Sequence, residues 1–173
     1  MNDAKRERAL VLGIGNVLLR DEGLGVRAIE YFSERYGFGP DVDCLDGGTS
    51  GLGLLSYIKD YSHIIVVDAV AASGPPGKVI RIPGEEVAKW PALKSTSAHQ
   101  IGLRDLIEIA RFQGLSPELV IIGIIPKDIT PGLELTPETA ESVPKAAEAV
   151  REELSRFGFK AERKKPSPFE KGG

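Results

Sequence analysis

Four side chains that could bind a metal or transfer protons stand at comparable places in the sequence: Glu22, Asp46, Asp68 and His99. Glu22 follows the first apolar run, Asp46 follows the second, and Asp68 ends the third. His99 stands in the first turn of a helix that we expect to begin at Ser97. In an open α/β sheet, the carboxyl ends of the strands share one edge, and ligands bind there. We therefore expect these four groups to converge in one crevice.

Two carboxylates and one imidazole form a ligand set for a divalent transition metal and leave positions open for water or substrate. Glu22, Asp68 and His99 could supply this set. The dipole at the start of a helix disfavours imidazolium, so it favours the neutral form of His99 that binds metals. Asp21 precedes Glu22, and we expect both carboxylates to point into the crevice.

Each of these residues also has a purely structural interpretation. Glu22, ahead of a helix, could only compensate the helix dipole, and His99 could be an exposed surface residue. Asp46 is followed by two glycines and could form hydrogen bonds to the local backbone in a turn. Asp68 ends an otherwise apolar run, where an acid is rarely fully buried without a partner, and this favours a functional role.

Other residues with reactive side chains are interpreted as structural. His63 begins a strand without acids beside it, and Cys44 lies in a strand as a small apolar residue. Gly13 and Gly15 match the start of a dinucleotide-binding fingerprint, but Leu18 occupies the position of its third glycine. The sequence contains no Walker loop, paired-cysteine zinc motif or zinc-peptidase helix motif.

Predicted strands and helices alternate along the chain, and they must position these side chains. Apolar runs predict strands at 9–14, 42–45, 63–70, 78–82 and 119–125. The strand at 78–82 follows a turn too short for a crossover, so we expect it to be antiparallel. Apolar stripes predict helices that start after residue 25, after residue 51, at residue 97 and at residue 136. Pro144 lies inside the last of these and predicts a kink.

This order predicts an α/β three-layer sandwich, with a mainly parallel, twisted sheet of about five strands and helices on both faces. We expect one domain over residues 1–159. Residues 160–173 are charged and contain proline and glycine, which predicts a disordered tail.

The composition narrows the classes of partner and compartment. The chain of 173 residues has a net charge of −3, which argues against nucleic-acid or membrane binding. Its single cysteine excludes an intramolecular disulfide and fits a reducing compartment. The sequence has no apolar run of the ~18 residues that a membrane span needs, and no secretory signal. We expect a cytoplasmic protein.

The sequence resembles the hydrogenase maturation endopeptidases, which trim the large-subunit precursors of nickel-containing hydrogenases. The similar segments are 13–26, 46–51, 67–69, 97–100 and 123–126, and they occur in family order. The first of these segments, GIGNVLLRDEGLGV, is long and specific. The sequence departs from the family pattern at Ala98, where the family commonly has proline. The resemblance implies that Glu22, Asp68 and His99 contact nickel. It also implies that Asp46 is a site acid, and we take it as the catalytic candidate.

The resemblance implies a substrate that already carries its nickel–iron centre, from which the enzyme removes a short C-terminal extension. Nickel would then be supplied by the hydrogenase large-subunit precursor and would bridge it to the protease, which we expect to be a monomer. The metal could polarise the scissile carbonyl, or a carboxylate such as Asp46 could activate water, as in an aspartic-type endopeptidase.

Two other functions remain open from the sequence. The segment Gly13-Ile14-Gly15-Asn16 is also similar to the start of peptidyl-tRNA hydrolases, which are esterases. That function needs a histidine shortly after the loop and a basic surface, but the histidines are His63 and His99 and the net charge is negative. A non-enzymatic nickel-sensing protein could use the same three ligands, and proteolysis of a metal-loaded precursor would distinguish it from the enzyme.

Overall fold

The fold is described from a computed structural model, for residues 7–50, 53, 55–89 and 103–165. The elements follow one another as β1 (Ala9–Ile14), η1 (Arg20–Gly23), α1 (Leu24–Arg35), β2 (Tyr36–Phe38), β3 (Val42–Gly48), α2 (Leu55–Ile58), β4 (His63–Ala69), β5 (Val79–Pro83), η3 (Val87–Lys89), α3 (Leu103–Phe112), β6 (Glu118–Ile124), α4 (Pro137–Ala140), α5 (Val143–Arg156) and β7 (Ala161–Arg163). No helix in these ranges is long and apolar enough to span a membrane.

The main sheet has five strands in the order β3-β1-β4-β6-β5. β1 pairs in parallel with β3 and β4, and β4 pairs in parallel with β6. β5 is antiparallel to β6 at the edge of the sheet. The central strands are apolar runs because both of their faces are covered. The predicted sheet, including its short antiparallel strand, is confirmed.

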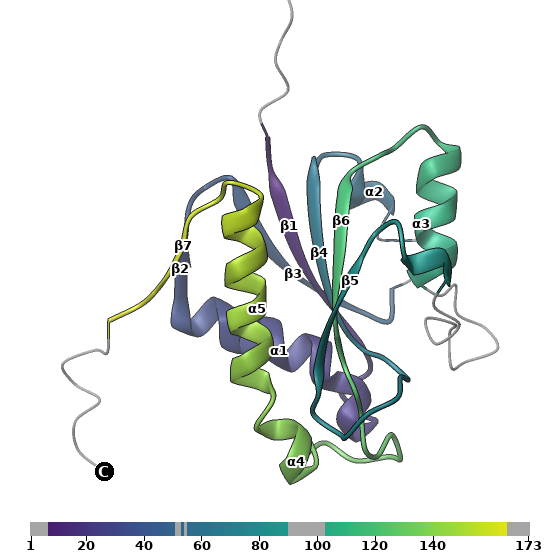
Figure 1. Cartoon of the computed structure of the whole chain (residues 1–173), viewed down its shortest axis with the longest axis vertical. Helices are drawn as coiled ribbons and strands as arrows, with labels where there is room; N and C mark the ends of the chain where they lie inside the picture. The colour runs from purple at the N-terminus through teal and green to yellow at the C-terminus, as the bar shows by residue number, and fades with distance from the viewer. Residues whose placement is uncertain (1–6, 51–52, 54, 90–102, 166–173) are drawn as a thin grey trace, which may run out of the picture.

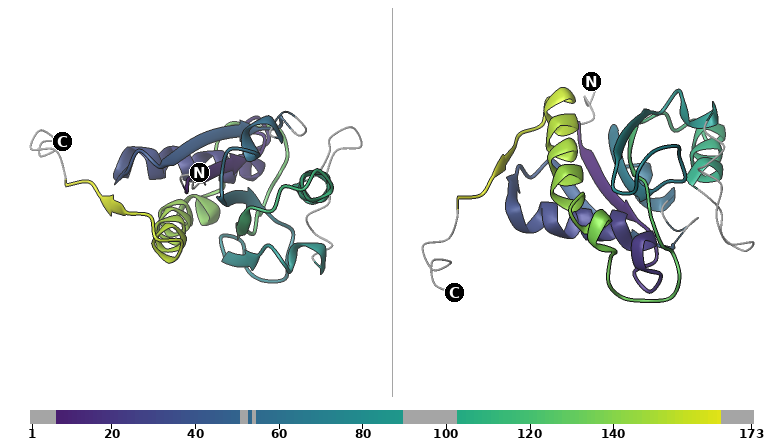
Figure 2. Two further views of the ribbon diagram at one scale, coloured as in Figure 1. Left: turned by 90° about the horizontal axis from the view of Figure 1, so that it is seen from above. Right: turned by 60° about the horizontal axis from the view of Figure 1, so that its bottom comes forward.

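Helices cover both faces of this sheet (Figure 1). On one face, α1 and α5 pack against alternate residues of β1, β4 and β6, and Phe32, Val150 and Leu154 are fully buried there. On the other face, Ile58 of α2 and the partly buried Ile107 of α3 pack against the remaining strand residues. Seen from above, α3 lies far from α1 and α5 (Figure 2). The predicted three layers are therefore present.

A second, two-stranded sheet corrects the prediction for the C-terminal segment. β7 pairs antiparallel with β2, and the backbone N–H of Lys164 donates to the carbonyl of Arg35 at 2.8 Å. The aromatic ring of Phe159 packs against His63, with ring centroids 5.4 Å apart. The predicted disorder from residue 160 onwards is wrong for 161–164, because β2 offers an unpaired extended edge. Residues 166–173 lie outside the described ranges.

The segment predicted as the last helix is divided into α4 and α5. Thr136 precedes α4 and Pro137 opens it, as predicted. Pro144 lies in the first turn of α5, where a backbone N–H has no partner within the helix, so proline costs little. The predicted kink at Pro144 is wrong because a new helix begins there. The predicted helix start at Ser97 lies outside the described residues.

Candidate active site

Glu22 is carried to the carboxyl end of β4 by the turn that follows β1. Glu22 belongs to η1, which contacts β4 and leads directly into α1. A Cβ atom on Gly25 would lie 2.2 Å from the carbonyl oxygens of both Ile14 and Val67. Any side chain at position 25 would therefore push the start of α1 away from the strand ends. Glycine at this position allows Glu22 to approach Asp68, the residue after Val67.

Asp68 has an electrostatic environment unlike that of an ordinary acid. Burial raises the pKa of the Asp68 carboxyl to about 8, and the negative charge of Glu22 contributes to this shift. A contribution from the charge of Glu22 to the pKa of Asp68 requires the two carboxylates to lie near each other. Two neighbouring carboxylates, one of them desolvated, are poorly stable as a pair of anions and suit a shared cation. The structure thus brings two of the predicted ligands to one edge of the sheet.

Asp46 lies at the same end of the sheet, but on β3. β1 separates β3 from β4, so Asp46 stands two strands from Asp68, roughly 10 Å across the sheet. The Asp46 side chain is exposed, and its Oδ1 accepts a hydrogen bond from the backbone N–H of Gly48 at 2.8 Å. This local bond is the turn role that was the alternative interpretation of Asp46.

His99, the third predicted nickel ligand, lies outside the described residues. Within the described part of the chain, no group of three or more His, Cys, Asp or Glu side chains could hold a metal ion. The described residues therefore provide Glu22 and Asp68 as oxygen ligands, and the imidazole of His99 stays a prediction.

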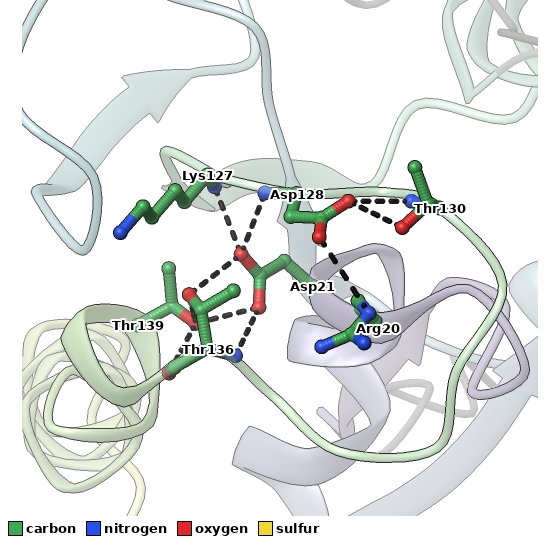
Figure 3. Close-up of polar contacts among 7 residues, drawn as sticks. All are labelled: Arg20, Asp21, Lys127, Asp128, Thr130, Thr136 and Thr139. Atoms are coloured by element: carbon green, nitrogen blue, oxygen red, sulfur yellow. Dashed lines mark hydrogen bonds and ion pairs between the residues drawn. The ribbon is translucent and has the colours of Figure 1, made fainter.

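Asp21 is fully buried and accepts five hydrogen bonds, all from the segment that follows β6 (Figure 3). The backbone N–H groups of Lys127 and Asp128 donate to its Oδ2 at 2.9 and 3.0 Å. The N–H of Thr136 donates to Oδ1 at 2.8 Å, and its hydroxyl donates to Oδ2 at 2.9 Å. The Thr139 hydroxyl donates to Oδ1 at 2.7 Å. We call these five residues the Asp21 cluster.

The Asp21 cluster corrects a prediction about the crevice. Burial alone would raise the pKa of the Asp21 carboxyl, but hydrogen bonds from Thr136, Asp128, Thr139 and Lys127 lower it below the ordinary value. Asp21 is therefore held as a carboxylate and is enclosed by protein donors. The prediction that Asp21 points into the crevice with Glu22 is wrong. Thr136 and Thr139 supply hydroxyl donors at the start of a predicted helix, but nothing near them in the sequence links them to Asp21.

The backbones of the two loops are also joined directly. The N–H of Gly132 donates to the carbonyl of Leu18, and the N–H of Arg20 donates to the carbonyl of Gly132, both at 2.9 Å. Arg20 has a φ of 45°, in the left-handed region that non-glycine residues rarely adopt. The surrounding contacts hold this strained conformation. The loop that carries Glu22 is therefore fixed from both sides.

The remaining reactive side chains of the described residues have structural surroundings. Burial raises the pKa of the Cys44 thiol to about 11, so a thiolate nucleophile is disfavoured there. His63 opens β4, at the edge of the sheet opposite to Asp68, and its ring packs on Phe157 with centroids 4.7 Å apart. The carboxylate of Glu118 lies 3.6 Å from Nε2 of His63, so the expectation that no acid stands beside His63 is wrong. Apart from this acid, Cys44 and His63 have the structural surroundings that were expected.

The fold and the site together define an α/β protein with paired acids at the carboxyl edge of a mainly parallel sheet. A family model described as hydrogenase maturation protease matches residues 26–153. The chain belongs to this family, and it is a protease.

Known relatives cover nearly the whole chain. The chain is 39% identical over 158 residues to the hydrogenase 2 maturation protease of Escherichia coli (strain K12), covering 89% of this chain and 94% of the relative. It is 38% identical over 159 residues to the hydrogenase expression/formation protein HupD of Bradyrhizobium diazoefficiens, covering 91% and 83%. Among solved structures, it resembles the hydrogenase maturating endopeptidase HybD from E. coli with a TM-score of 0.84 and 38% identity, covering 92% and 99%.

The family assignment confirms the resemblance found in the sequence. Membership of a protease family also argues against the two alternative functions, a peptidyl-tRNA hydrolase-like esterase and a non-enzymatic nickel-sensing protein.

Proposed function

We propose that this protease removes the C-terminal extension of a nickel-containing hydrogenase large-subunit precursor, and that it recognises the nickel in that substrate through Glu22, Asp68 and His99. The observation that carries the proposal is the approach of Glu22 to Asp68 at the carboxyl edge of the sheet, where the negative charge of Glu22 helps to raise the pKa of Asp68. This pair gains most from a cation that arrives with the substrate.

The chemistry of the two ligands supports a bridging role. Carboxylate oxygens bind divalent metals, but two carboxylates and one imidazole without thiolates hold a free ion weakly. They can complete the coordination of an ion that another protein already anchors. A bound divalent metal can polarise a nearby carbonyl. Glu22 and Asp68 would then bind and orient the precursor, and a precursor without nickel would present nothing to bridge.

Asp46 is the residue that we propose to activate water for attack on the peptide bond. Its carboxylate is exposed at the same end of the sheet, which leaves it accessible to solvent and substrate. Its hydrogen bond to Gly48 fixes one oxygen and orients the group. The prediction is that Asp46→Asn lowers kcat and leaves precursor binding unchanged, whereas Glu22→Gln weakens binding.

The decisive test compares two matched precursors, one loaded with nickel and one free of it, with enzyme that has been stripped by a chelator. Loss of C-terminal mass, followed by mass spectrometry, should occur only with the nickel-loaded precursor. Glu22→Gln and Asp68→Asn should raise the Kd for that precursor, while Glu30→Gln, an exposed acid on α1, should not. Equal cleavage of both precursors, or a requirement to reload the enzyme itself with metal, would contradict the proposal.

We also propose that the enzyme works as a monomer in the cytoplasm, and its one cysteine suits a reducing compartment of this kind. Size-exclusion chromatography with light scattering checks the oligomeric state: a mass near 18.6 kDa is expected, and a mass near twice this value contradicts it.

A further inference from the structure

Large apolar side chains are exposed on the two loops that the Asp21 cluster joins. Leu18 is 61% exposed, Ile129 is 44% exposed and Leu133 is 66% exposed. Leu18 lies between β1 and η1, and the other two lie between β6 and α4. We call these three residues the apolar rim. Within the described residues, the other large exposed apolar side chains are Tyr57 and Phe112, which belong to α2 and α3 on the opposite layer.

The backbone places members of the apolar rim next to each other despite their separation in sequence. Leu18 accepts a hydrogen bond from Gly132, the residue before Leu133, at 2.9 Å. Leu19 and Gly132 form an isolated parallel bridge. Leu18 and Leu133 therefore flank the same bridge, one on each side of the contact between the loops.

The apolar rim is held rigidly in its exposed position. Asp128, the residue before Ile129, donates its backbone N–H to Asp21 and accepts a hydrogen bond from the N–H of Asp21 at 3.1 Å. The Oδ1 of Asp128 also accepts from the N–H and the hydroxyl of Thr130, at 2.8 and 2.7 Å. A fixed loop cannot turn its apolar side chains into the core. An exposed surface that is already ordered loses little conformational freedom when a partner covers it.

The apolar rim is continuous with the proposed site. Glu22 follows Leu18 by four positions on the same loop, and Arg20 between them forms an ion pair with Asp128 at 3.5 Å. Apolar side chains flanked by charged groups are typical of protein-binding surfaces. The two loops stand together at the bottom of Figure 1, so a protein substrate that contacts Glu22 would also lie near the apolar rim.

We propose that the apolar rim is the surface on which the hydrogenase large-subunit precursor docks, through a complementary apolar surface of its own. This inference rests on the proposed function and adds a second, metal-independent contact to it. Burial of one exposed leucine should contribute about tenfold in affinity. Nickel would report that the precursor is ready, and the apolar rim would supply affinity for the large subunit itself.

The test uses the full-length enzyme with nickel-loaded precursor and measures Kd, KM and kcat. Leu18→Ser and Leu133→Ser should each raise Kd and KM about tenfold, and the double variant about a hundredfold, with kcat changed less than twofold. The same loss of affinity should be seen with nickel-free precursor, whereas Glu22→Gln should affect only the nickel-loaded form. Leu133→Met should bind like the wild type because it keeps an apolar side chain.

Phe112→Ser is the matched control, because Phe112 is 94% exposed and ends α3 close before β6 begins, at the opposite edge of the sheet. It should leave Kd and KM unchanged, and thermal unfolding should show that all variants are folded. An unchanged Kd in the double variant, or an equal loss in Phe112→Ser, would overturn the docking surface while wild-type cleavage still supports the proposed function. If the wild type neither binds nor cleaves the precursor, the proposed function itself fails and the docking surface with it.

Discussion

At the scale of single residues, Asp21 contributes most to the order of the site loops. Each of its carboxylate oxygens faces at least one backbone N–H, from Thr136 on Oδ1 and from Lys127 and Asp128 on Oδ2. An asparagine amide would have to point its NH₂ group at one of these donors. We therefore expect Asp21→Asn to lower the free energy of unfolding by about 1–3 kcal/mol.

Urea denaturation checks this prediction, with Glu30→Gln on the surface of α1 as the control. A loss below ~0.5 kcal/mol for Asp21→Asn, the usual range of surface substitutions, would show that the Asp21 cluster tolerates an amide.

The raised pKa of Asp68 predicts that the stability of the metal-free protein depends on pH. Its pKa is about 8 in the folded state and has an ordinary value of 3.8. Between these values the folded state binds more protons than the unfolded state, so the contribution of Asp68 to stability falls as the pH rises from about 4 to 8. Asp68→Asn removes this ionisation. Its stability relative to the wild type should therefore increase over the same interval.

Thermal unfolding at pH 5 and pH 8.5, after treatment with a chelator, measures this difference. Asp46→Asn serves as the control, because Asp46 is an exposed acid at the same edge whose turn an asparagine oxygen can also form. A constant difference between Asp68→Asn and the wild type at both pH values would contradict the burial of this carboxyl.

The sequence predicted the placement of Glu22 and Asp68 but not the role of Asp21. The first two follow from topology, because residues at the carboxyl ends of parallel strands meet at one edge. The donors to Asp21 lie 106 to 118 positions further along the chain. No local pattern indicates which of two adjacent acids such a distant segment will enclose.

At the scale of elements, β7 shows what the C-terminal segment adds to the domain. A chain that ends at Lys160 would lose the pairing of Ala161–Arg163 with Tyr36–Phe38. It would also lose the hydrogen bond between Lys164 and Arg35. We expect this truncation to lower the free energy of unfolding by about 1–3 kcal/mol, since each net hydrogen bond contributes ~1 kcal/mol.

A chain that ends at Lys165 keeps β7 and serves as the matched control for urea denaturation. Equal stability of the two truncated chains would mean that β7 contributes nothing to the fold.

The strands of the main sheet were predictable because each is an apolar run with both faces covered. β2 and β7 are short, half-exposed and distant in sequence, so they carry no apolar periodicity. The division between α4 and α5 was missed because Pro144 is compatible both with a kink inside a helix and with the first turn of a new one.

At the scale of the whole molecule, one stabilising contact joins α5 to β5, outside the proposed site. The carboxylate of Glu153 on α5 is 2% exposed and accepts hydrogen bonds from Arg81 of β5 at 2.6 and 3.1 Å. It also forms an ion pair with Arg156. This buried group joins the helical layer to the edge strand of the sheet.

We therefore expect opposite effects from two substitutions of the same type. Glu153→Gln should lower the free energy of unfolding by about 1–3 kcal/mol, because an amide replaces a charge that two guanidinium groups surround. At temperatures where it remains folded, its Kd for the nickel-loaded precursor should equal that of the wild type.

Glu22→Gln should leave the free energy of unfolding within ~0.5 kcal/mol of the wild type, because Glu22 lies at the partly exposed start of a helix. Its Kd for the same precursor should rise at least tenfold. Urea denaturation and equilibrium binding on the same samples separate the two outcomes. If Glu153→Gln weakened precursor binding as much as Glu22→Gln, recognition would depend on the α5 layer, and the assignment of binding to the carboxyl edge of the sheet would be wrong.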